Sequence, residues 1–297
     1  MNKNLFLFFM LFCIILSCGN NANVTKNLDN SDNTNDTVIR IGVLPTLDAL
    51  PFFIAKERGF FEREKIGIKL IPFKAHMDID TALVGGSVDA AFTDMIRVER
   101  LISSYGVKLH YLTTTELYWT LVSNKAARIN RLDQFGDKMV AMTRWSATDY
   151  FTNKTFDKVK TKAMVYGVQI NDIDIRLKMI LNNEMDGAWL PEPQATIAID
   201  KGNKNLLSTR KYKEKLGVIA LRTQKKTDKR IENELRKIYS EACDSINKYG
   251  IKSYSWEISK YCHVSNDIVK KVPTYIYIHA ETPIESSINI AKEFKRR

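Results

Sequence analysis

The segment VIRIGVLPTLDALPFFIAKERGFF, residues 38–61, decides the fold class of this chain. Every second residue from Ile39 to Val43 is apolar, which predicts a strand with one buried face. Thr46 or Asp48 is suited to cap the helix that follows, and a proline is tolerated in the first turn of a helix. The segment therefore predicts a strand, a loop and a helix in direct succession.

The same alternation continues along the next part of the chain and predicts a largely parallel sheet with helices on its faces. Apolar residues two apart indicate strands, and apolar residues three or four apart indicate helices. The double glycine Gly85-Gly86 is suited to stop the second helix. The expected strands are Val38–Leu44, Ile66–Phe73, Val88–Thr93 and Lys108–Thr114, and the further helices are Asp78–Val84 and Arg97–Tyr105.

A second run of strands and helices begins near Leu121 and ends in helices without further strands. Only a short strand candidate, Val168–Ile170, lies between Lys158 and Asp174, so we expect a reduced sheet in this half. The other expected strands are Lys138–Thr143, Asp186–Leu190 and Leu216–Arg222. The expected helices are 145–160, Asp172–Leu181, Pro191–Lys201, Asp228–Tyr249, Ser253–Cys262, Asn266–Lys271 and Pro283–Lys295.

The amino-terminal segment predicts export from the cytoplasm. Leu5–Leu16 is an almost unbroken apolar run, too short to cross a bilayer and suited to a signal peptide over residues 1–17. Ile15-Leu16-Ser17-Cys18 resembles a bacterial lipobox, which implies acylation of Cys18 and stable membrane anchoring through several acyl chains. A plain signal peptide and a retained transmembrane anchor are the alternatives. Residues 18–37 would form the acylated cysteine and a disordered tether, since they are rich in asparagine and almost free of apolar side chains.

Composition and charge exclude several function classes. The chain has 297 residues and a net charge of +11, and its basic residues are spread out apart from a dense stretch at Arg222–Arg230. Nucleic-acid binding would need a basic face with stacking aromatic residues or a groove-entering motif, and neither is present. The histidines are scattered, and Cys243 and Cys262 are either buried free thiols or a disulfide. The sequence therefore predicts no metal site, no cofactor and no nucleic-acid partner.

Three short motifs follow one another in a fixed order. They are IGVLPT with AKERGFFE (41–46 and 55–62), GGSVDAAFTD (85–94) and NEMDGAWLPEPQA (183–195). Together they resemble the type II periplasmic-binding proteins of ABC importers, in the branch that carries sulfonates, nitrate, thiamine precursors and related small molecules. The resemblance covers the chain from about Val38 to the carboxyl terminus.

This resemblance implies an α/β fold, the two-lobed clamshell of the type II periplasmic-binding proteins with two crossover hinge strands. Residues 38–115 would be the first part of lobe 1, residues 116–215 lobe 2 with the hinge, and residues 216–297 the return to lobe 1 with the carboxyl-terminal helices. A small-molecule ligand would bind in the cleft between the lobes and favour the closed form. An ABC permease and ATPase complex would then recognise this extracytoplasmic, lipid-anchored monomer.

Loops at the carboxyl ends of strands supply the candidate ligand-binding residues, because such loops face the cleft and often open a helix. Several candidates also have ordinary structural roles. Thr46, Asp48 and Ser146 are natural helix caps, while Trp145 and Trp189 would either pack between the lobes or sandwich a flat ligand. The candidates are Thr46, Asp48, Thr93, Asp94, Glu116, Trp145, Ser146, Thr148, Trp189 and Glu192.

Carboxylates and tryptophans in this set favour a heteroaromatic or amine ligand, held by stacking and cation–π contact. A sulfonate or nitrate ligand would instead need helix N-termini and an arginine, and Arg144 beside Trp145 could serve.

Two other function classes are alternatives to the importer. A ligand-sensing receptor domain would use the same clamshell. Biosynthetic enzymes on the same fold, the pyrimidine synthases, carry a cluster of cysteines and a reactive histidine, but no cysteine lies here between Cys18 and Cys243. No serine or cysteine nucleophile is paired with a nearby base either. The sequence therefore predicts a binding protein and no enzyme.

Overall fold

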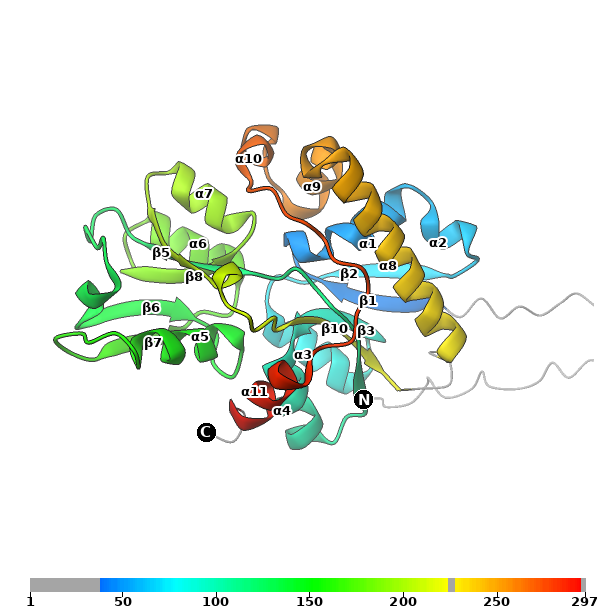
Figure 1. Cartoon of the computed structure of the whole chain (residues 1–297), viewed down its shortest axis with the longest axis horizontal. Coiled ribbons are helices and arrows are strands. Elements are labelled where there is room, and N and C mark those ends of the chain that lie inside the picture. Colours follow the sequence, from blue (N-terminus) through cyan, green and yellow to red (C-terminus); the bar gives the residue numbers. More distant parts are fainter. Residues whose placement is uncertain (1–37, 224–227, 295–297) are drawn as a thin grey trace, which may run out of the picture. The chain divides into compact units, whose positions relative to one another are not determined.

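The computed structural model describes residues 38–223 and 228–294, all within one compact unit built on two five-stranded sheets (Figure 1). The predicted signal peptide 1–17, Cys18 and the tether lie outside the described residues, as do residues 224–227 of the basic stretch. Within the described part, no helix is both long enough and apolar enough to cross a membrane.

The first sheet has the strand order β2-β1-β3-β10-β4. β1 pairs in parallel with β2 and β3. β10 comes from far along the chain and lies antiparallel between β3 and β4. The strands are β1 (Ile39–Val43), β2 (Ile68–Pro72), β3 (Ala90–Asp94), β4 (Leu109–Thr114) and β10 (Gly217–Arg222).

The second sheet repeats this plan with the order β7-β6-β8-β5-β9, so the expectation of a reduced sheet is wrong. β7 pairs with β6 over five residues, but it is an edge strand with exposed positions and lacks a clear apolar alternation. β5 lies antiparallel between β8 and β9. The strands are β5 (Trp119–Ser123), β6 (Lys138–Met142), β7 (Val165–Gln169), β8 (Gly187–Pro191) and β9 (Lys204–Ser208).

Two passages connect the sheets, and they touch each other. One joins β4 to β5, and the other joins the short helix η3 (Thr209–Lys211) to β10. The backbone N–H of Thr115 donates to the carbonyl oxygen of Gly217 at 2.9 Å. A Cβ at Gly217 would lie 2.5 Å from Leu117 Cβ and 2.6 Å from Thr115 Oγ1, so this close approach requires glycine. The predicted lobe boundaries at 115/116 and 215/216 lie in these two passages.

Helices cover both sheets. On the first sheet, α8 packs against α1, and α11 packs against α4 (Figure 1). The helices of this half are α1 (Leu50–Glu57), α2 (Phe60–Arg63), α3 (His76–Gly85), α4 (Met95–Tyr105), α8 (Lys229–Tyr249), α9 (Ser255–Cys262), α10 (Asn266–Lys271) and α11 (Glu285–Phe294). Those of the second half are α5 (Ala147–Phe156), α6 (Ile173–Leu181) and α7 (Gln194–Asp200).

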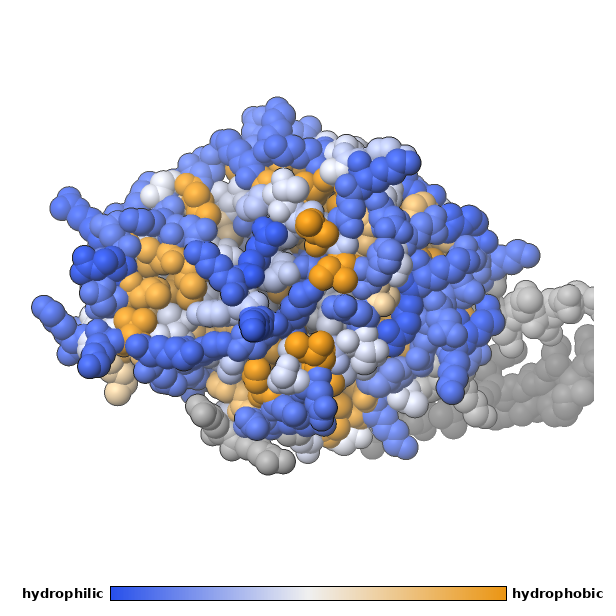
Figure 2. Space-filling model, in the orientation of Figure 1, coloured by the Kyte–Doolittle hydropathy of each residue, from blue (hydrophilic) through white to orange (hydrophobic). Residues whose placement is uncertain are grey.

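The long helix α8 shows how well the apolar pattern predicted burial. Figure 2 shows that the surface around α8 is largely hydrophilic, as expected for the outer face of an amphipathic helix. The inner face is buried as the spacing predicts, at Ile231, Leu235, Ile238, Ala242 and Ile246.

Two helices of the second half begin or end elsewhere than predicted. α5 ends at Phe156 rather than at residue 160. α7 begins at Gln194 rather than at Pro191, because Pro191 is still the last residue of β8.

Candidate functional site

Loops from both halves meet around a small enclosed chamber. Its volume is about 10 Å³, which is room for one water molecule. Predicted residues come together here, with Asp94 at the end of β3 and with Ser146 and Thr148 at the start of α5. The chamber is lined by His76, Asp94, Trp119, Thr143, Ser146, Thr148, Ile173, Arg176 and Pro191.

Hydroxyl groups at the start of α5 form one wall of this chamber. Ser146 Oγ accepts a hydrogen bond from the backbone N–H of Thr148 at 3.1 Å, which confirms the predicted cap. The same hydroxyl donates to the carbonyl oxygen of Thr143 at 2.6 Å, and Thr148 Oγ1 accepts from the backbone N–H of Thr143 at 2.9 Å. A helix start carries a partial positive charge, so this wall is suited to a negative group.

Arg176 of α6 is a buried cation of the chamber, only 3% exposed. Its guanidinium donates to backbone carbonyl oxygens, including that of Trp189 at 2.7 Å, and to Thr143 Oγ1 at 2.5 Å. Burial, followed by the charge of Arg97, lowers the pKa of Arg176 to about 9, and the Asp172 charge offsets part of this effect. Arg176 is therefore positive at neutral pH, although its hydrogen-bond partners are neutral.

A buried ion pair between Arg97 and Asp80 joins α4 to α3 next to the chamber. Arg97 Nε lies 3.1 Å from Asp80 Oδ1, and a second bond links Nη2 to Oδ2. Burial holds the pKa of His76 well below its ordinary value, and the charges of Arg97 and Arg176 lower it further. Within the described residues, Arg97 Nη1 and His76 Nε2 are buried without a hydrogen-bond partner. Burial and the two neighbouring guanidinium groups therefore disfavour the protonated form of His76.

Asp94 brings a carboxyl group of the first sheet towards the second half. It caps α4, since Oδ1 accepts from the backbone N–H of Arg97 at 3.1 Å. Burial raises the pKa of Asp94 to about 6, while the Arg97 charge and the backbone N–H groups of Arg97 and Ala147 lower it. Ala147 is the first residue of α5, so this carboxyl group interacts with the helix starts of both halves.

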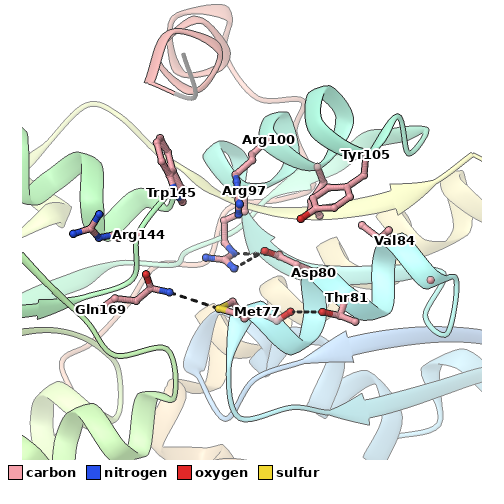
Figure 3. A pocket seen from close by; sticks show the side chains of 12 residues that line it. Met77, Asp80, Thr81, Val84, Arg97, Arg100, Tyr105, Arg144, Trp145 and Gln169 are labelled. Atoms are coloured by element: carbon pink, nitrogen blue, oxygen red, sulfur yellow. Dashed lines mark hydrogen bonds and ion pairs between the residues drawn. The ribbon is translucent and has the colours of Figure 1, made fainter. Parts of the chain in front are cut away.

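A larger groove of about 480 Å³ lies beside the chamber. Figure 3 shows side chains of α3 and α4 along this groove, with Arg144 and Trp145 of the loop after β6 facing them. Of the ligand-binding residues predicted from the sequence, Trp145 lines this groove. The groove is lined by Met77, Asp80, Thr81, Val84, Gly85, Arg97, Arg100, Leu101, Tyr105, Arg144, Trp145 and Gln169.

Trp189 lies apart from Trp145, whereas the sequence suggests that the two either pack between the lobes or sandwich one flat ligand. Its side chain is fully buried on β8, and its Nε1 donates to Thr152 Oγ1 at 2.9 Å. The ring packs against Phe151 with the ring centroids 6.0 Å apart. Trp189 lines neither of the two cavities described above and has the contacts of a core residue. Thr93 is likewise fully buried on β3.

The loop after β1 contacts the loop after β8. The backbone N–H of Leu47 donates to the carbonyl oxygen of Glu192, and Gln194 Nε2 donates to the carbonyl oxygen of Pro45, both at 3.0 Å. The predicted loops of Thr46 and Glu192 therefore meet between the two halves.

Thr46 and Asp48 do not cap α1, so that prediction is wrong. A short helix, η1 (Leu47–Ala49), precedes α1, whose cap position is Ala49, and Thr46 makes no side-chain cap bond. Asp48 is buried within η1. Burial raises the pKa of Asp48 to about 6, and a hydrogen bond with Thr46 lowers it.

Glu116 and Glu192 are already bonded to the protein. Glu116 accepts a hydrogen bond from Tyr118 and lies 3.6 Å from Lys215 Nζ. Glu192 Oε2 accepts from the backbone N–H of Thr196 at 3.1 Å and from its hydroxyl at 2.6 Å. These contacts satisfy much of the hydrogen-bonding capacity of both carboxylates.

The sequence did not indicate the buried titratable side chains of His76, Asp80, Arg97 and Arg176. Each lies on a predicted helix or next to its start, where a charged side chain is ordinarily solvated. Arg144, the one arginine considered for an anion, lines the groove.

The described residues contain no group of three or more histidine, cysteine or acidic side chains placed to hold a metal ion. Cys243 and Cys262 are both free and buried, and burial raises the pKa of each thiol.

Residues 32–112 match the model of the NMT1-like family. No curated protein matches the chain by sequence. The likeness to solved structures extends over most of the chain.

Three solved structures illustrate this likeness. The periplasmic aliphatic sulphonate binding protein SsuA from Escherichia coli is 13% identical, with a TM-score of 0.69 over 87% of this chain and 85% of that chain. The ligand-binding component of an ABC-type import system from Staphylococcus aureus is 15% identical, with a TM-score of 0.71 over 91% of its own length and 87% of this chain. The periplasmic nitrate-binding protein NrtA from Synechocystis PCC 6803 is 15% identical, with a TM-score of 0.67 over 78% of this chain and 68% of that chain.

Identities this low show a common fold. The strand order of both sheets and the two passages between them agree with the α/β class that the sequence predicts. The chain therefore has the fold of the periplasmic solute-binding proteins of ABC importers, and its residues 32–112 are similar to the NMT1-like family.

Proposed function

We propose that this chain is the solute-binding component of an ABC importer and that it captures a small anionic solute at the chamber and groove between its two halves. The fold supports the importer role, because the similar structures include the ligand-binding component of an ABC-type import system. The binding role needs no catalytic group, so the proposed function is not enzymatic.

The observation that carries the anionic solute is the buried charge of Arg176. A buried cation is costly unless an opposite charge accompanies it, and the hydrogen-bond partners of Arg176 are neutral. Arg97 adds an unpartnered Nη1 among the described residues, and the start of α5 adds its partial positive charge. An anion bound here would gain from all three groups and would offset the cost of burying Arg176, against the repulsion of the Asp94 carboxylate, which lines the same chamber and already accepts from the backbone N–H of Ala147.

Three of the four predicted carboxylates that favour an amine are occupied by the protein itself, whereas Asp48 Oδ1 is buried without a partner among the described residues. Asp94 caps α4, Glu192 is bonded to Thr196, and Glu116 pairs with Lys215. An amine would have to break these contacts to gain its own. We therefore favour a sulfonate, nitrate, carboxylate or phosphate group over an amine as the part of the solute that enters the chamber, which must widen from about 10 Å³ by separation of the two halves to admit it.

The amino terminus completes the proposed role. Acylation of Cys18 would anchor the protein outside the cytoplasm, and the stretch up to residue 37 would serve as a tether. The protein would act as a monomer and deliver its solute to a permease and ATPase complex. Its domains would be the lobes 38–115 and 116–215 with the return 216–297.

Thermal unfolding of the full chain with added anions tests this function. At a concentration a hundredfold above its Kd, a ligand of the native state adds about 2.7 kcal/mol, which is roughly 5–10 °C in Tm for a chain of this size. We expect such a shift with nitrate, a sulfonate, a carboxylate or a phosphate, measured at constant ionic strength against chloride.

Arg176→Met should abolish that shift, whereas Arg230→Gln, which removes an exposed arginine of α8, should leave it unchanged. A Tm shift with thiamine, pyrimidines or amines, and none with any anion, would overturn the anionic solute and restore the ligand class that the sequence favours.

A further inference from the structure

The groove beside the chamber is large enough for more than a single small anion. Its volume of about 480 Å³ falls in the range of small-molecule sites, whereas the chamber holds about 10 Å³. Nitrate or a sulfonate head group would not fill a groove of this size, so the groove has room for a further part of the solute.

In two segments of the chain, adjacent residues line different cavities. His76 lines the chamber and Met77 the groove, and Ser146 lines the chamber while Trp145 lines the groove. The two cavities therefore share walls that are one residue thick. A solute with its head group in the chamber would therefore reach the groove where the side chains of this wall move apart.

The charge in the groove is positive. Three arginines and one aspartate line it, and Asp80 is already paired with Arg97. Within residues 38–223 and 228–294, the guanidinium groups of Arg100 and Arg144 form no hydrogen bond or ion pair. The charge of Arg144 nevertheless lowers the pKa of the Asp149 carboxyl group. Two cations are thus available to an anionic group in the groove.

Trp145 supplies a flat apolar surface between these cations. Its ring lies 5.9 Å from the guanidinium carbon of Arg100, and Figure 3 shows Arg144, Trp145 and Arg100 in this order across the groove. The side chain is 36% exposed, so it is not held in a core.

The backbone of Trp145 is strained. Its φ of +57° is in the left-handed region, an outlier for a bulky residue, and its N–H donates to Asp149 Oδ2 at 2.9 Å. Such strain costs of the order of 1–3 kcal/mol and is maintained where the surrounding structure over-determines it, commonly at ligand sites. The protein thus maintains an unfavourable conformation that keeps the ring in the groove.

We propose that the groove is a second subsite of the same solute site and that it takes a planar ring carrying its own anionic group. The solute is then an aromatic or heteroaromatic dianion. One anionic group lies in the chamber with Arg176, the ring lies on Trp145, and the second anionic group lies between Arg100 and Arg144. This inference rests on the proposed function, since it assigns the groove to the solute whose head group occupies the chamber.

Two matched series of probes test the inference by calorimetry on the full chain. One series is methanesulfonate, benzenesulfonate and 3-sulfobenzoate, and the other is acetate, benzoate and isophthalate. In at least one series, we expect the ring to raise affinity about tenfold and the second anionic group to raise it about tenfold again, which is about 1.4 kcal/mol for each step.

Single substitutions test which residue is responsible for each gain in affinity. Arg100→Gln and Arg144→Gln should each reduce the affinity of the dianion towards that of the mono-anionic ring and leave the smallest probe unchanged. Trp145→Ala should remove the gain that the ring provides. Arg230→Gln is the control for the loss of one positive charge.

The outcomes separate this inference from the proposed function. Binding of the smallest anions with no gain from the ring or the second charge would overturn the second subsite and leave the anion-binding function intact. Gains that persist in Arg100→Gln, Arg144→Gln and Trp145→Ala would place the subsite elsewhere and would also overturn it. Failure of every probe in both series would overturn the anionic solute and the inference together.

Discussion

The backbone N–H of Leu47 donates to the carbonyl oxygen of Glu192 at 3.0 Å, so the loop after the first strand of one sheet is bonded to the loop after β8 of the other. Gln194 adds a side-chain bond to Pro45 in the same place. These bonds fix the approach of the two loops in the conformation that encloses the chamber.

Gln194→Ala is therefore expected to weaken solute binding without a matching loss of stability. We expect this bond between the two loops to break when the halves separate, so its removal should cost about 1 kcal/mol of closure, or roughly fivefold in affinity. Calorimetry with an anion that shifts the Tm of the wild type checks this. An unchanged affinity would show that the bond does not contribute to closure.

Asp80→Asn is expected to destabilise the protein strongly. Arg97 would lose its carboxylate while remaining buried, and breaking a buried pair by removing one partner costs about 3–5 kcal/mol. Urea unfolding measures the difference. Asp267→Asn is the matched control, since it breaks the exposed pair with Lys270 and should change stability by less than about 1 kcal/mol. Equal losses of stability in Asp80→Asn and Asp267→Asn would show that burial does not determine the cost of breaking an ion pair.

The pKa of Asp94 predicts a pH dependence of stability. Burial raises this pKa from 3.8 to about 6, so the folded state binds the proton more tightly than the unfolded state. The contribution to the free energy of unfolding is complete below pH 4 and is lost as the pH rises through 6.

We therefore expect the free energy of unfolding of the wild type, minus that of Asp94→Asn, to fall by about 2 kcal/mol from pH 4 to pH 7. Asparagine keeps the cap of α4, so the difference isolates the titration of Asp94. Urea unfolding at each pH supplies the values, and a difference that rises or stays flat would contradict the raised pKa.

Gly217→Ala is expected to destabilise the protein by about 1–3 kcal/mol, because the new Cβ would overlap with Leu117 and Thr115 at the passage between the sheets. Gly85→Ala is the control: nothing lies within 4 Å of its Cβ position at the end of α3, and alanine favours a helix by about 0.5–1 kcal/mol. Thermal unfolding should shift in opposite directions for the two variants. A stabilised Gly217→Ala would mean that the passages separate easily.

The two tryptophans of the predicted site should respond differently to truncation. Trp189→Ala empties a fully buried core position and should cost about 3–5 kcal/mol. Trp145→Ala leaves the core intact and should change the free energy of unfolding by less than about 1 kcal/mol. Urea unfolding distinguishes them, and a large loss for Trp145→Ala would assign its ring to packing rather than to the solute.

Local sequence pattern is sufficient to predict several of the helices and strands. The alternation from Ile39 to Val43 gives β1, and the spacing of Ile231, Leu235 and Ile238 gives the buried face of α8. Ser146 was recognisable as a cap because a serine oxygen needs only the N–H groups two or three residues further on. The edge strand β7 was underestimated, because a strand with one neighbour needs little apolar alternation.

Which residues form the candidate site depends on tertiary contacts. Arg176 and Arg97 look like ordinary surface charges of amphipathic helices, and they become buried because elements distant in the sequence close over them. Trp189 and Trp145 look equivalent in sequence, but the position of Trp189 on β8, between β6 and β5, places it in the core. The burial of a side chain and the electrostatic potential around it depend on residues that are distant in the sequence. A local sequence pattern carries no information about these residues.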